Sequence, residues 1–107
     1  MTDLNAGLAS IWEKRRSLIE QRLVAIEAAS AAVDVGYCSP DLRAEAAEQA
    51  HTLAGSLGAF GLPSASIVAR QVEAILRGIE TSVAETSRLK SLSQLLRRLI
   101  EQGPNFR

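Results

Sequence analysis

The sequence contains few of the residues that build most catalytic and metal-binding sites. It has one histidine, His51, and one cysteine, Cys38, in 107 residues. A lone cysteine excludes a disulfide framework, and one histidine with one distant cysteine cannot supply the ligands of a structural zinc site. No glycine-rich phosphate loop with a lysine is present, so nucleotide binding has no visible basis. We therefore expect no cofactor and no metal.

Net charge and aromatic side chains are also scarce. Lysine plus arginine equals aspartate plus glutamate at 12 each, and aromatic residues make up 4% of the chain. A nucleic-acid-binding domain usually carries a basic stripe, often with aromatic side chains on which bases stack. The composition therefore predicts that the chain has no nucleic-acid partner.

Long apolar runs are absent as well. No stretch approaches the roughly 18 apolar residues that a helix needs to cross a bilayer. The first residues, Met1 to Leu4, lack a charged leader followed by an apolar segment, so no secretory signal is recognised. We expect a soluble, cytoplasmic protein with no membrane partner.

Alanine and leucine dominate the composition, and strong helix formers outnumber β-branched residues. The length suggests that residues 1–107 form one domain. Four segments show apolar residues at helical spacing. They run from about Leu4 to Val33, Pro40 to Phe60, Pro63 to Gly78, and from Thr81 or Ser82 to Gln102. Their short connections predict an all-α fold, an antiparallel up-down four-helix bundle.

Local signals set the expected helix ends. Ser39-Pro40 and Leu62-Pro63 are typical helix starts, and Gly61 and Gly103 are typical stops. Gly7 is expected to separate a short opening turn from the first helix, and residues 105–107 to form a frayed tail. The side chains expected to face the core include Leu4, Leu8, Ile11, Leu18, Leu23, Ile26, Val33, Ile67, Val68, Val72, Ile75, Leu76, Val83, Leu89, Leu92, Leu95, Leu96, Leu99 and Ile100.

His51 lies in a helix whose neighbouring residues are unusually small. At ~100° per residue, five small residues fall within about 60° of the histidine, whereas the large apolar side chains lie on the far side. The small residues are Ala44, Ala47, Ala54, Gly55 and Gly58. Glycine inside a helix costs roughly 1 kcal/mol relative to alanine, so the presence of Gly55 and Gly58 requires an explanation. The pattern predicts an imidazole that faces solvent in a clearing where a large partner can reach it.

This segment resembles the histidine-containing phosphotransfer (HPt) family of phosphorelays. It reads His51-Thr52-Leu53-Ala54-Gly55-Ser56-Leu57-Gly58-Ala59-Phe60-Gly61, followed one helix later by Gln71-Val72-Glu73. The resemblance covers about residues 44 to 76, and the flanking helices fit the same bundle. It implies that His51 is the phosphoacceptor. It also implies that Glu73, placed where chemotaxis-kinase phosphotransfer domains carry a glutamate, orients the imidazole. The chain departs from the family at Ala54, where a lysine that helps to neutralise the phosphoryl group is usual.

Imidazole chemistry agrees with this role. The neutral ring is nucleophilic near physiological pH, and a group that accepts from one nitrogen leaves the other nitrogen to attack. For Glu73 the alternative is an ordinary surface ion pair with Arg70 or Arg77. Arg70 is a candidate for meeting the phosphoryl oxygens in place of the missing lysine, its alternative being a solvated surface arginine. Ala47, Ala54, Gly55, Gly58 and Arg70 are the residues expected to surround a docked partner.

Two functional hypotheses follow. In the first, the chain is a monomeric phosphorelay intermediate and not an enzyme. His51 then takes a phosphoryl group from a response-regulator receiver domain or a histidine kinase and passes it on. In the second, favoured by Ala54, the chain is a helical binding module for a receiver or scaffold that has lost phosphotransfer. The sequence leaves open whether this is the first domain of a longer regulator, and which kinase, receiver and signal it serves.

Overall fold

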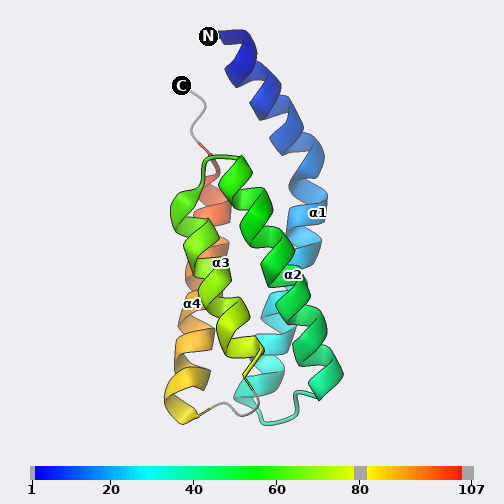
Figure 1. The fold of residues 1–107 in the computed structure, drawn as a ribbon, viewed down its shortest axis with the longest axis vertical. Coiled ribbons are helices and arrows are strands. Elements are labelled where there is room, and N and C mark those ends of the chain that lie inside the picture. The colour runs from blue at the N-terminus through cyan, green and yellow to red at the C-terminus, as the bar shows by residue number, and fades with distance from the viewer. Residues whose placement is uncertain (1, 79–81, 105–107) are drawn as a thin grey trace.

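Four helices follow one another in the computed structural model, which describes residues 2–78 and 82–104. They are α1 (Thr2–Asp34), α2 (Pro40–Ala59), α3 (Pro63–Leu76) and α4 (Val83–Gln102). Consecutive helices run in opposite directions, and α4 returns to pack against α1, which closes the bundle (Figure 1). The predicted all-α four-helix bundle is confirmed.

The predicted starts of α2 and α4 are made by serine caps. The Ser39 hydroxyl accepts from the amide of Leu42, and the Ser82 hydroxyl accepts from the amide of Glu85, each at 3.1 Å. Both bonds satisfy an amide that has no partner within its own helix. Thr81, the other residue considered for the α4 cap, lies outside the described residues, as does the expected tail at 105–107.

The first helix is continuous, so the expected break at Gly7 is wrong. A Cβ at Gly7 would meet no atom within 4 Å, which means that this glycine fits no turn and no close contact. The N-terminal part of α1 projects beyond the end of the other helices (Figure 1). Although α1 has 33 residues, none of the helices in the described ranges is apolar and long enough to span a membrane.

In α1, Leu23 and Ile26 are buried as expected, but nearer its N-terminus the inward-facing positions lie one residue later than expected. Trp12 and Ile19 are buried, whereas Ile11 and Leu18 are 47% and 37% exposed. Both pairs have the same seven-residue spacing, so periodicity alone could not choose between them. Trp12 packs edge-on against Phe60, with ring centroids 5.1 Å apart, and burial of its large ring decides which face turns inward. Two other residues expected inside, Ile67 and Val83, are exposed at the surface.

Helices α2 and α3 meet through small residues. The Ser66 hydroxyl donates to the Ala54 carbonyl oxygen at 2.8 Å, and a Cβ at Gly58 would lie 3.6 Å from the same hydroxyl. Ala47 and Ala69 are fully buried on the same two helices. We call Ala47, Ala54, Gly58, Ser66 and Ala69 the small-residue seam. Small side chains let two helices approach closely, so functional groups on α2 and α3 can meet above the seam.

The opposite side of the bundle, between α1 and α4, is polar. Arg97 on α4 contacts Glu20 and Glu27 on α1 at 2.8 and 2.6 Å, and Glu101 at 3.2 Å. Hydrogen bonds to Glu27 and Glu20 raise the pKa of Arg97.

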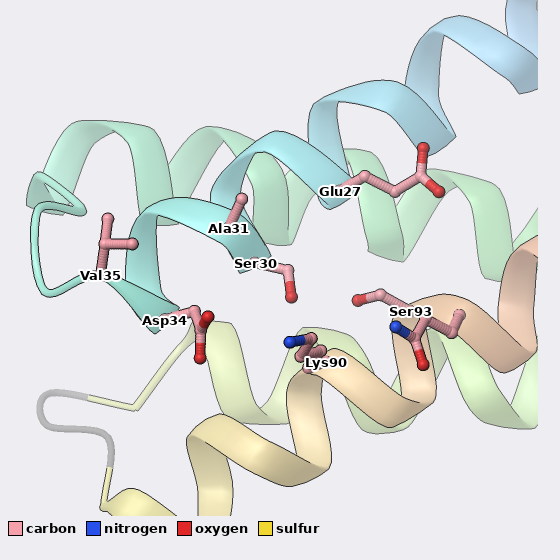
Figure 2. A pocket seen from close by; sticks show the side chains of 8 residues that line it. Glu27, Ser30, Ala31, Asp34, Val35, Lys90 and Ser93 are labelled. Atoms are coloured by element: carbon pink, nitrogen blue, oxygen red, sulfur yellow. The ribbon is translucent and has the colours of Figure 1, made fainter.

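A pocket of about 350 Å³ also lies between α1 and α4, and none of its lining residues comes from α2 or α3. Figure 2 shows Ser30, Ser93 and Lys90 around it. The Ser93 hydroxyl is buried and has no hydrogen-bond partner within the part of the chain that the structure describes. The pocket is therefore on a different side of the molecule from the helix that carries His51.

Candidate functional site

His51 projects into solvent from the outer face of α2. Its side chain is 68% exposed. Gly55, one turn further along, is also exposed, and a Cβ there would meet no atom within 4 Å. No packing contact among the described residues therefore explains Gly55, and its absent side chain leaves space beside the imidazole.

The expected clearing is smaller than the helical angles suggested. Ala47 and Ala54 are 0% and 3% exposed, so the expectation that both are exposed beside His51 is wrong. The small-residue seam brings α3 close to this side of α2 and covers both methyl groups. Ala44, Gly55 and Gly58 remain exposed. A docked partner can contact these three residues, but it cannot contact Ala47 or Ala54.

Glu73 reaches the imidazole from α3. Its Oε1 lies 3.2 Å from Nδ1 of His51. When Nδ1 carries the ring proton, it donates a hydrogen bond to the carboxylate. Nε2 is then the unprotonated nitrogen, and it makes no hydrogen bond within the described residues. The Glu73 side chain is only 16% exposed, so the carboxylate is held between the helices while the ring stands in solvent.

The second oxygen of Glu73 belongs to an ion-pair network. Oε2 accepts from Nε of Arg77 at 2.7 Å, and Nη2 of Arg77 contacts Oε1 of Glu48 at 2.9 Å. The hydrogen bond from Arg77, followed by that from His51, holds the pKa of Glu73 below its ordinary value. Glu73 is therefore a stable anion, and one side chain accepts from both the imidazole and a guanidinium.

The arginine that meets this network is Arg77 and not Arg70. Arg70 is exposed on α3 and forms no ion pair within the described residues, so nothing in the geometry directs it at His51. Sequence reasoning named Arg77 only as an alternative partner of Glu73. The sequence contains a signal that favours Arg77 as the partner of Glu73, because a glutamate four residues before a basic residue is the favourable orientation for a helical ion pair.

Arg43 fixes the end of α3 that carries Arg77. From α2, its Nη2 donates to the carbonyl oxygens of Ile75 and Gly78 at 2.9 and 3.0 Å. Carbonyls at a helix C-terminus lack partners within the helix, and a cation there also interacts favourably with the helix dipole. This contact links α2 to the last turn of α3, so it helps to position Glu73 and Arg77 relative to His51.

The arrangement supplies an imidazole and a carboxylate that orients it. An imidazole with one nitrogen bonded to a carboxylate presents the lone pair of the other nitrogen to an electrophile. Among the described residues, no group of three or more His, Cys, Asp or Glu side chains is placed to hold a metal ion. Any electrophile that reacts here must approach from solvent over the exposed face of α2.

Comparison with known proteins identifies a family that covers most of the chain. The Hpt domain family model matches residues 11–102, a range that includes His51, Glu73 and Arg77. The search of curated proteins and the search of solved structures find no match. Domains of this family have a histidine phosphotransfer role in phosphorelays and act as phosphocarriers that interact with receiver domains and kinases. The match covers most of the chain, and the chain belongs to the Hpt domain family.

Proposed function

We propose that His51 accepts a phosphoryl group on Nε2 from a receiver aspartate or a histidine kinase and passes it to the next aspartate of a phosphorelay. One observation carries the proposal. The contact between His51 Nδ1 and Glu73 Oε1, at 3.2 Å, engages one ring nitrogen and leaves the other on an exposed side chain. The family match supports the same reaction class.

The transfer needs one bond to form and one to break. The lone pair of Nε2 attacks phosphorus of the aspartyl phosphate, the bond from phosphorus to the carboxyl oxygen breaks, and the carboxylate leaves with the electron pair. Nδ1 keeps its proton and donates a hydrogen bond to Glu73, whose negative charge offsets the positive charge that the ring gains. Magnesium and most of the charge neutralisation come from the receiver, because phosphoryl transfer depends chiefly on positioning and electrostatics. The chain itself is a carrier.

The partner docks over the face that carries His51 and Gly55. On the α1 side of this face lies a groove of about 330 Å³, with Ile11 and Leu18 on α1 opposite Thr52 and Ser56 on α2. Ile11 and Leu18 are two apolar side chains of α1 that were expected in the core and instead lie at the surface. Apolar side chains of this kind next to a reactive group are typical of a protein-binding surface.

The test is phosphotransfer from a receiver carrying labelled phosphate. We expect acid-labile label on the natural protein and none on His51→Gln. Because the side chain is 68% exposed, the variant should unfold within about 1 kcal/mol of the natural protein. Label that persists on the variant would refute the assignment. Receiver binding without any label on the natural protein would instead favour the binding-only module, the hypothesis that Ala54 suggests.

A further inference from the structure

The immediate surroundings of His51 carry more negative than positive charge. Two carboxylates, Glu48 and Glu73, and one guanidinium, Arg77, form the network beside the ring. Ala54 supplies no cation, and its methyl group is buried. A phosphoryl group arriving at Nε2 brings further negative charge, which the nearby carboxylates repel. A cation of this chain that can turn toward the phosphoryl group would therefore favour the transfer.

Arg77 can turn in this way without releasing Glu73. Its Nε binds Glu73, and a different atom, Nη2, binds Glu48. A guanidinium carries five N–H donors in a planar fork, so one edge can hold a carboxylate while another edge changes partner.

The two carboxylates differ in how firmly they are held. The Glu48 side chain is 63% exposed, whereas that of Glu73 is 16% exposed. An exposed ion pair contributes little, at most about 1 kcal/mol. Glu48 also stands one turn before His51 on α2, and residues three apart on a helix are neighbours on its surface. Glu48 is the partner that Arg77 can give up.

We propose that Arg77 exchanges Glu48 for the phosphoryl group. Before transfer, Arg77 bridges Glu73 and Glu48. During transfer, Nε stays on Glu73 and keeps that carboxylate on Nδ1 of His51, while the Nη groups leave Glu48 and donate to phosphoryl oxygens. Arg77 is thus a positioning residue for Glu73 and the cation that replaces the missing lysine at position 54, and Glu48 competes with the phosphoryl group. This inference rests on the proposed function of His51.

The experiment uses the whole chain and phosphoramidate, a small donor that requires no knowledge of the natural partner. Phosphohistidine formation is followed by ³¹P NMR in the natural protein and in Arg77→Gln, Glu48→Gln and the double variant. Arg98→Gln is the matched control, since Arg98 is an exposed arginine of α4 outside the network. Thermal melts establish that each variant is folded.

We expect Arg77→Gln to slow phosphorylation roughly 10-fold, the size of one charge-assisted hydrogen bond. Glu48→Gln should accelerate it about 3-fold, because Arg77 is then released from competition at an exposed pair. In the Arg77→Gln background the Glu48 change should have no effect, since no cation remains to be released. Arg98→Gln should react like the natural protein. On phosphorylation, the guanidinium NMR signals of Arg77 should shift and those of Arg98 should not.

Two results would overturn the exchange while leaving the phosphoacceptor intact. An equal acceleration by Glu48→Gln with and without Arg77 would show simple charge repulsion. An equal slowing by Arg98→Gln and Arg77→Gln would show a general effect of positive charge. If the natural protein forms no phosphohistidine at position 51, the proposed function fails and the exchange fails with it.

Discussion

At the residue scale, two buried serines differ in one respect that stability can report. The Ser66 hydroxyl donates to the Ala54 carbonyl oxygen across the α2–α3 seam, whereas the Ser93 hydroxyl has no partner within the described residues. We expect Ser66→Ala to lower the free energy of unfolding by about 1 kcal/mol, the typical net value of a hydrogen bond. Ser93→Ala should leave it unchanged or raise it by up to about 1 kcal/mol, because it removes an unsatisfied polar group.

Urea unfolding at neutral pH measures both variants against the natural protein. Each variant removes the same oxygen atom from a side chain that is 6% or 4% exposed, so the two serve as controls for each other. Equal losses of stability would mean that Ser93 has a hydrogen-bond partner in solution.

The lowered pKa of Glu73 makes a prediction about acid. Hydrogen bonds from Arg77, and then from His51, favour the ionised carboxylate in the folded state. The folded pKa therefore lies below the unfolded one, so the stabilisation is fully present above the unfolded value, about 4.3. It is lost as pH falls through the folded pKa. The stability advantage of the natural protein over Glu73→Gln should thus be constant between about pH 7 and 5 and shrink toward pH 3.

Thermal melts of the two proteins at matched pH measure this difference, and subtraction removes the other carboxylates, which both proteins share. An advantage that persists unchanged at pH 3 would show that the ion pair with Arg77 does not stabilise the fold.

At this scale the sequence predicted the positions of His51 and Glu73 but not the ion pair between Arg77 and Glu48. The exposure of His51 followed from helical angles, and the proximity of Glu73 followed from a family motif. The Arg77–Glu48 contact crosses from α3 to α2, and no single-helix pattern contains it. Helical spacing favours Arg77 over Arg70 as the partner of Glu73, but the contact of Arg77 with Glu48 depended on how α3 is rotated against α2.

At the scale of elements, the seam changes what a lysine at position 54 would do. From the sequence, Ala54→Lys should have been harmless because the site was expected to be exposed. In the structure Ala54 is 3% exposed, and its own carbonyl accepts from Ser66. A longer side chain must push α3 away, and overpacking typically costs 1–3 kcal/mol. We expect a loss of roughly 2 kcal/mol in denaturant unfolding.

The matched control is Gly55→Lys, one position later, where a Cβ would meet no atom within 4 Å. This variant introduces the same charge without crowding and should be at least as stable as the natural protein, because glycine is unfavourable inside a helix. If Ala54→Lys were as stable as Gly55→Lys, the seam would be looser than the structure indicates.

The helix ends could be predicted from the sequence. Which residues near the N-terminus of α1 face the core could not be predicted, and the difference has a physical reason. Caps such as Ser39 and Ser82 act within a few residues, so the local sequence contains them. Whether Ile11 or Trp12 faces inward depends on contacts with Phe60, nearly fifty positions away. Gly7 could not be interpreted from the local sequence for the same reason. A glycine ends a helix only where a turn or a close contact with another part of the molecule requires it.

At the scale of the whole molecule, Arg97 joins the first helix to the last. It contacts Glu20 and Glu27 on α1 and Glu101 on α4. Arg97→Gln removes the shared cation and leaves three carboxylates near one another. We expect a loss of about 1 kcal/mol at low salt, since the network is partly exposed. The loss should differ between 0.05 and 1 M sodium chloride, because salt screens both the natural attraction and the repulsion in the variant.

Guanidinium chloride is itself a salt, so urea is the denaturant for this measurement. Arg98→Gln, an exposed neighbour that does not join this network, is the control and should change stability by less than about 0.5 kcal/mol. Equal effects of the two substitutions would mean that the network does not hold α1 to α4.

The seam between α2 and α3 also bears on how a partner could distinguish the two phosphorylation states. Alanine, serine and glycine have few side-chain rotamers, so a seam built from them offers little scope for repacking. Under the proposed function, phosphorylation of His51 would therefore change mainly the charge on the exposed face of α2. A receiver would then distinguish the two states by the sign and placement of that charge.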